Sequence, residues 1–104
     1  MKDVLPEIEA WRASGKGVAV ATVVKVEGSA PRPVGAALAV SDAGDLAGSV
    51  SGGCVETAVF EEAQGVLRTG TPKLLRYGIT DEMAWDVGLA CGGTIEVFVE
   101  PVAR

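Results

Sequence analysis

Apolar and polar positions follow two different periods along the chain, and together they predict two helices and five strands. Apolar residues recur at helical spacing near the N-terminus and again over residues 54–68. Elsewhere they form short continuous runs or alternations, bounded by glycine, proline or small polar residues, as is typical of strands. The expected strands cover residues 18–26, 36–40, 46–50, 72–79 and 94–102.

Each helix should bury one face. Asp3 is suited to cap the first helix, and residues 14–17, with two glycines, are suited to end it. In the second helix, Glu56 lies in the first turn, where a negative charge complements the helix dipole. The buried positions expected in the first helix are Val4, Leu5, Ile8 and Trp11, and those in the second are Val55, Ala58, Val59, Ala63, Val66 and Leu67.

The strand patterns differ in how many faces they bury. Residues 18–26 are almost continuously apolar, which predicts an interior strand, whereas residues 94–102 alternate and predict one wetter face. Residues 41–45 favour a turn, so the strands on either side should form a hairpin. The order is therefore α-β-β-β-α-β-β. We expect a single α/β mixed domain over residues 1–104, with one mixed β-sheet partly covered by two helices.

Composition narrows the classes of function. The 104-residue chain has a formal net charge of −5, which argues against a nucleic-acid-binding or anionic-membrane surface. It contains no histidine, so the commonest metal ligand and general base is missing. Residues 1–7 lack the layout of a signal peptide, and no apolar run approaches the length of a membrane span. We expect a cytoplasmic protein with reduced thiols and without nucleic-acid or membrane partners.

Both cysteines of the chain adjoin a Gly-Gly pair, and this coincidence marks the candidate site. Cys54 follows Gly52-Gly53, and Cys91 precedes Gly92-Gly93. Glycine pairs allow backbone N–H groups to converge, and such groups before a helix N-terminus can bind an anion. The helix N-terminus also favours the thiolate of a cysteine in its first turn. Taken alone, each cysteine could equally be a small buried residue, and each glycine pair an ordinary turn.

Further polar residues could complete an anion site beside these segments. Arg32 lies between two prolines that stiffen its loop, so its guanidinium could bind a phosphate through two hydrogen bonds. Ser29 and Ser51 could donate to the same anion. The alternatives are a solvated surface arginine, serines that stabilise turns, and a Glu56 that serves the helix dipole alone.

Four motifs together resemble the XdhC/CoxI family, the accessory proteins of molybdenum hydroxylases such as xanthine dehydrogenase and carbon monoxide dehydrogenase. The resemblance extends over essentially the whole chain, and the motifs stand in the family's order. They are Gly28-Ser29-Ala30-Pro31-Arg32 with Gly35-Ala36, Ser51-Gly52-Gly53-Cys54-Val55-Glu56, Gly88-Leu89-Ala90-Cys91-Gly92-Gly93, and Glu100-Pro101.

The resemblance implies a cofactor-binding accessory protein without catalytic residues of its own. Family members bind molybdenum cofactor (molybdopterin) as cargo, protect it during maturation and help to load it into the target enzyme. By position, Cys54 and Cys91 would lie near the molybdenum, the four glycines would form a backbone cradle, and Arg32 would face the pterin phosphate. The implied cofactor-binding residues are Ser29, Arg32, Ser51, Gly52, Gly53, Cys54, Glu56, Cys91, Gly92 and Gly93.

The resemblance also bears on partners. Besides the target hydroxylase, a cysteine desulfurase, a separate Rossmann-domain protein and further copies of the chain are implied. Family members commonly carry a Rossmann-type domain after this one, and residues 1–104 contain no dinucleotide-binding glycine fingerprint that would match it. The resemblance therefore covers the first domain, and the second domain is expected to be absent.

Two other functions stay open at this point. One is a thiol oxidoreductase or sulfur-transfer protein in which Cys91 resolves Cys54, which requires the two residues to come within disulfide distance. The lack of a C-x-x-C motif and of histidine weakens it. The other is a structural oligomerisation module whose glycine bends serve packing alone.

Overall fold

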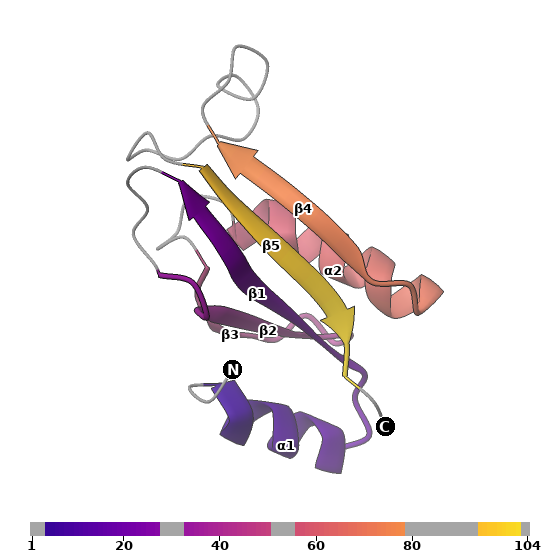
Figure 1. Ribbon diagram of the computed structural model, residues 1–104. Helices are drawn as coiled ribbons and strands as arrows, with labels where there is room; N and C mark the ends of the chain where they lie inside the picture. The colour runs from indigo at the N-terminus through magenta and orange to yellow at the C-terminus, as the bar shows by residue number, and fades with distance from the viewer. Residues whose placement is uncertain (1–3, 28–32, 51–55, 79–93, 103–104) are drawn as a thin grey trace.

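The computed structural model describes residues 4–27, 33–50, 56–78 and 94–102, which form two helices and a five-stranded sheet. Figure 1 shows the arrangement of these elements. In chain order they are α1 (Leu5–Ala13), β1 (Val18–Glu27), β2 (Ala37–Ser41), β3 (Leu46–Gly48), α2 (Glu56–Thr69), β4 (Lys73–Gly78) and β5 (Thr94–Pro101). The α/β mixed class and the predicted order of elements are thus confirmed.

The strand order in the sheet is β3-β2-β1-β5-β4, and all four neighbouring pairs are antiparallel. The sequence patterns favour a mixed sheet, and the observed pairing differs from that expectation for a topological reason. β4 runs parallel to β3, as strands joined by a crossover helix do. However, β2, β1 and β5 lie between them, so no two parallel strands are neighbours among the strands described.

The first part of β1, residues 18–23, is largely buried on both faces, because each face packs against a different helix, whereas Val24 is 48% exposed. Ala19, Ala21 and Val23 belong to the cluster that α2 completes, whereas Val18 and Val20 pack with α1. Figure 1 shows α2 behind the sheet, while α1 lies beside the start of β1. The continuous apolar run over residues 18–26 therefore does mark an interior strand, as predicted.

The second helix buries the positions expected from its spacing. It ends at Thr69, and the next residue, Gly70, donates its N–H to the carbonyl oxygen of Val66 at 2.7 Å and turns the chain out of the helix with a φ of +73°. Val55 lies outside the described residues. The remaining predicted stripe of α2 is buried as expected, Val59, Ala63 and Val66 fully, and Ala58 and Leu67 partly.

The first helix departs from the expected buried face at one position. Val4 and Ile8 are buried, and Trp11 packs partly against the same cluster. Leu5 is 43% exposed, because neighbouring residues on a helix point about 100° apart and Val4 already faces the sheet. The apolar face of α1 is therefore narrower than predicted.

The last strand, β5, confirms the predicted alternation. Ile95, Val97 and Val99 are buried, and they face the cluster that contains α2. Phe98, which breaks the apolar-polar alternation in the sequence, lies on the other face and is only partly buried. β5 therefore has the one wetter face that the pattern indicates.

Candidate functional site

Glu56 is the one predicted site residue within the part of the chain that the structure describes. The structure does describe the framework to which the other candidates are attached. The residues that flank the other candidates show where the candidate segments are attached to the sheet and to α2. The candidates outside the described residues are Ser29, Arg32, Ser51, Gly52, Gly53, Cys54, Cys91, Gly92 and Gly93.

Two of the three candidate segments are attached at one end of the sheet. Residues 28–32 follow Glu27, the last residue of β1, and residues 79–93 connect Gly78 to Thr94. Thr94 pairs with Glu27 on one side and with Gly78 on the other. The end of β1, the start of β5 and the end of β4 therefore form one row across the sheet, visible at the upper left of Figure 1.

The third candidate segment, residues 51–55, follows a stretch that is fixed against β2. The N–H of Ser49 donates to the carbonyl oxygen of Ala37 at 3.0 Å, and Val50 is fully buried. Gly48 has a φ of +85°, and a Cβ there would collide with the Ala37 carbonyl. Since β3 runs in the same direction as β1, this stretch leads toward the end of the sheet described above.

The carboxylate of Glu56 joins the start of α2 to this fixed stretch. Its Oε2 accepts a hydrogen bond from Ser49 Oγ at 2.8 Å and another from the N–H of Val50 at 2.9 Å. Hydrogen bonds to an ionised acceptor are among the stronger ones in proteins. Glu56 does lie in the first turn of α2, as predicted, whereas its contact with a cofactor stays a prediction.

The part that Ser49 plays was not predicted from the sequence. The capping box, the sequence motif that pairs a serine with a glutamate at a helix start, joins residues three apart. The separation of seven residues between Ser49 and Glu56 exceeds that of the usual motif. Only the three-dimensional path of the chain identifies the pair.

Charged side chains of both signs surround this end of the sheet. Lys25 Nζ lies 3.0 Å from Glu27 Oε1 and 3.6 Å from Glu96 Oε2. The hydrogen bond from Lys25 is the main cause that lowers the pKa of Glu27, and Glu27 in turn raises the pKa of Lys25. The Lys25 and Glu27 side chains are 57% and 51% exposed, so water screens the pair. These charges form a solvated rim and not a buried ionic site.

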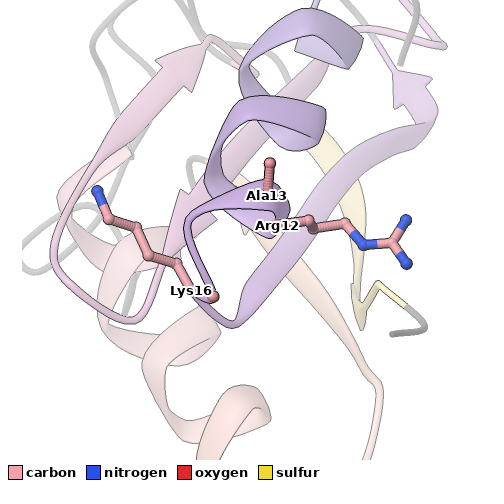
Figure 2. Close-up of a pocket in the computed structure, with 4 residues that line it drawn as sticks. Arg12, Ala13 and Lys16 are labelled. Carbon is pink, nitrogen blue, oxygen red and sulfur yellow. The ribbon is translucent and has the colours of Figure 1, made fainter.

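A cavity of about 430 Å³ lies near the start of β1, at the opposite end of this strand from Glu27, to which residues 28–32 are attached. Figure 2 shows it at the turn between α1 and β1. Lys16, at its edge, is held by an ion pair with Asp45 at 2.8 Å. The length of β1, from Val18 to Glu27, separates this cavity from the end that carries the candidates. Among the described residues, those that line it are Arg12, Ala13, Gly15 and Lys16.

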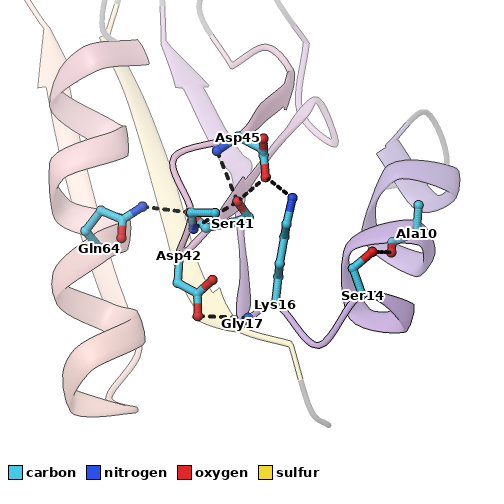
Figure 3. Close-up of polar contacts among 9 residues, drawn as sticks. Ala10, Ser14, Lys16, Gly17, Ser41, Asp42, Asp45 and Gln64 are labelled. Atoms are coloured by element: carbon cyan, nitrogen blue, oxygen red, sulfur yellow. Dashed lines mark hydrogen bonds and ion pairs between the residues drawn. The ribbon is translucent and has the colours of Figure 1, made fainter.

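A buried serine connects three parts of the framework, as Figure 3 shows. Ser41 Oγ donates to Asp45 Oδ2 at 2.6 Å and accepts from the N–H groups of Ala43 and Asp45. Lys16 Nζ donates to the same Oδ2, and Gln64 of α2 donates to the Ser41 carbonyl oxygen at 2.8 Å. Hydrogen bonds from Lys16 and then Ser41 lower the pKa of Asp45. The network holds the β2–β3 turn to α2 and to the connection between α1 and β1.

The described ranges contain neither a metal-binding cluster nor a membrane-spanning helix. Residues 4–27, 33–50, 56–78 and 94–102 hold no group of three or more histidine, cysteine, aspartate or glutamate side chains that could bind a metal ion. None of the helices described in these ranges is long and apolar enough to cross a membrane.

Comparison with known proteins gives consistent matches. The model of the XdhC and CoxI family matches residues 11–78, more than half of the chain. The molybdenum cofactor insertion chaperone PaoD of Escherichia coli is 43% identical over 83 residues, which cover 79% of this chain and 26% of that protein. A Bacillus subtilis protein named as a probable xanthine dehydrogenase subunit is 37% identical over 87 residues, which cover 82% and 26%.

A solved structure has the same fold. A protein described as a xanthine dehydrogenase from Bacillus halodurans superposes with a TM-score of 0.80 and 34% sequence identity, over 99% of this chain and 31% of that one. The chain thus spans about a quarter to a third of the length of these relatives.

Proposed function

Because this chain belongs to the XdhC and CoxI family, we propose that it binds molybdenum cofactor and assists its maturation or its insertion into a molybdenum hydroxylase. The target would be an enzyme of the xanthine dehydrogenase or carbon monoxide dehydrogenase type. The relative named a molybdenum cofactor insertion chaperone supports the class of cargo. The relative named a probable xanthine dehydrogenase subunit supports the class of target.

One structural observation carries the proposal. The framework residues that flank all three candidate segments lead to the same end of the sheet, through the Glu27–Thr94–Gly78 row and the stretch after β3. Segments attached at one end of a sheet can contribute to one site. This arrangement supports a shared site for residues separated widely in sequence.

In this site each type of residue would bind a different part of the cofactor. The N–H groups around Gly52-Gly53 and Gly92-Gly93 would bind anionic oxygens of the cofactor, since glycine lets the backbone approach closely. Arg32 would bind the pterin phosphate, with Ser29 and Ser51 as hydroxyl donors. The thiolates of Cys54 and Cys91 would lie near the molybdenum, because soft sulfur ligands suit a metal of this kind.

The proposal extends to partners and location. The chain would act in the cytoplasm, where thiols stay reduced, and would associate with the target hydroxylase and with further copies of itself. A cysteine desulfurase or a separate Rossmann-domain protein would take part in sulfuration or in closing the site. The chain itself would turn over no substrate.

The decisive experiment is anaerobic gel filtration of the chain with cofactor released from a known molybdoenzyme, followed by molybdenum analysis. We expect co-elution for the wild type, weaker co-elution for Cys54→Ser and Arg32→Ala, and no change for Arg12→Ala. Arg12 is a matched control, because it is an exposed arginine at the opposite end of the sheet. Absence of molybdenum from the wild-type peak, or equal loss in both arginine variants, would contradict the proposal.

A further inference from the structure

The two hydrogen bonds of Glu56 clamp the ends of a candidate segment together. The donors, Ser49 Oγ and the N–H of Val50, precede residues 51–55, and the acceptor follows them directly. A single oxygen, Oε2, receives both bonds, at 2.8 and 2.9 Å. The clamp therefore sets the separation between the two points at which this segment is attached.

Each side of the clamp is itself held by the framework. On one side, Ser49 is bonded to Ala37 of β2, and Val50 is fully buried in the cluster that also contains Val59 of α2. On the other side, Glu56 begins α2, whose first buried position is Val59. The clamp thus joins two elements that are each packed into the core, and its loss would remove neither of them from the core.

The Glu56 side chain is poorly suited to bind an anionic cofactor directly. An ionised carboxylate only accepts hydrogen bonds, and a phosphate likewise offers acceptor oxygens. Two like charges would also repel each other at short range. The carboxylate already accepts two hydrogen bonds from this chain. Its chemistry therefore suits a contact within the protein better than a contact with the cofactor.

We propose that Ser49 and Glu56 are positioning residues of the cofactor site, which fix Val50 and the start of α2, the two flanks of residues 51–55. The inference rests on the proposed function, because it concerns how the same site is preorganised. A short segment between two fixed ends has few conformations to lose when a ligand binds, and preorganisation of this kind raises affinity. In this proposal Glu56 fixes the residues around the site and does not itself bind the cofactor.

The test compares four single variants of the chain by titration with the same released cofactor. Glu56→Ala removes the acceptor and should weaken binding about tenfold, the scale of one or two charge-assisted hydrogen bonds. Ser49→Ala should weaken it about threefold. Glu56→Gln keeps an oxygen that can accept both bonds and should stay within about threefold of the wild type. Glu61→Ala is the matched control, because it removes an exposed carboxylate from the same helix and should change nothing.

A second measurement separates positioning from simple loss of stability. In a Cys91→Ser background, Cys54 is the sole thiol, and its labelling rate reports on the clamped segment well below the melting temperature. We expect the rate to change at least about threefold in Glu56→Ala and Ser49→Ala, and to stay constant in Glu61→Ala. Ser49→Ala alters no charge, so its effect on the rate is not electrostatic.

The outcomes distinguish the two hypotheses. If the wild type binds no cofactor, both the proposed function and this inference are refuted. If the wild type binds but Ser49→Ala and Glu56→Ala bind equally well, the inference alone is overturned. Equal losses in Glu56→Gln and Glu56→Ala would also overturn it, because they would mean that the charge itself, and not the clamp, supports binding.

Discussion

Replacing Gly48 by alanine should destabilise the protein far more than the same replacement at Gly44. Both glycines have a positive φ, +85° and +95°, so both replacements share the cost of a left-handed conformation, about 1–2 kcal/mol. The surroundings differ. No atom lies within 4 Å of a Cβ built at Gly44, whereas a Cβ at Gly48 overlaps the carbonyl oxygen of Ala37 and the side chain of Val4.

The additional cost at Gly48 can be worked out from what must move. Relieving the overlap would push β3 away from β2 and lengthen the 3.0 Å hydrogen bond from Ser49 to Ala37. Overpacking costs about 1–3 kcal/mol and a lost hydrogen bond about 1 kcal/mol. With the conformational cost included, Gly48→Ala should lower the free energy of unfolding by roughly 3–6 kcal/mol, against about 1–2 kcal/mol for Gly44→Ala.

The assay is urea unfolding followed by tryptophan fluorescence, with circular dichroism as a second probe. Native proteins are stable by about 5–15 kcal/mol, so Gly48→Ala would remove a large part of the stability, and its urea midpoint would fall far more than that of Gly44→Ala. Equal losses in the two variants, within about 0.5 kcal/mol, the agreement expected between like substitutions, would refute the steric explanation.

Three further predictions concern the polar network and the titrating groups. Ser41→Ala should lower the free energy of unfolding by about 2–3 kcal/mol, because it removes three hydrogen bonds at a buried position; an unchanged urea midpoint would contradict this. The pKa of Asp45 lies below its usual 3.8 in the folded state, so its contribution to stability is present above that value and is lost as the pH falls through the folded pKa. Asp45→Asn should therefore flatten the acid side of the melting temperature against pH, and an unchanged profile would rule that contribution out. Burial raises the pKa of Tyr77 to about 12, and as the chain has one tyrosine, an absorbance titration reports it directly. Its contribution to stability is present below the unfolded pKa of 10.0 and is lost as the pH rises toward 12; a midpoint near 10 in the folded protein would show that the side chain is solvated.

Sequence patterns predicted the elements well because each pattern reflects a local period. The run over residues 18–26 indicated an interior strand, and β1 does lie between β2 and β5 in the sheet. The stripe of α2 and the glycine at its end were likewise visible in the sequence, since helical spacing and a left-handed C-terminal residue are local properties. Leu5 was misplaced, because spacing alone does not tell how wide the buried face of a helix is.

The candidate site was predictable only as a set of segments. The paired Cys and Gly-Gly motifs identified which residues to consider, but Glu56 is the one of them whose contacts the structure describes. Its partners Ser49 and Val50 could not be read from spacing. Their hydrogen bonds depend on how β3 is held against β2 and on where α2 begins.

By itself, then, the sequence determined the kind and order of the elements, and its motifs indicated the family. Hydrophobic period, helix capping and turn chemistry each depend on a few neighbouring residues, so they can be recognised in the sequence. The tertiary structure alone decided which strands are neighbours, with three strands between β3 and β4. It also decided that Lys16, Ser41 and Gln64 meet and that the flanks of the candidate segments share one end of the sheet. These contacts join residues far apart in sequence, and their geometry follows from packing two helices on opposite faces of one sheet.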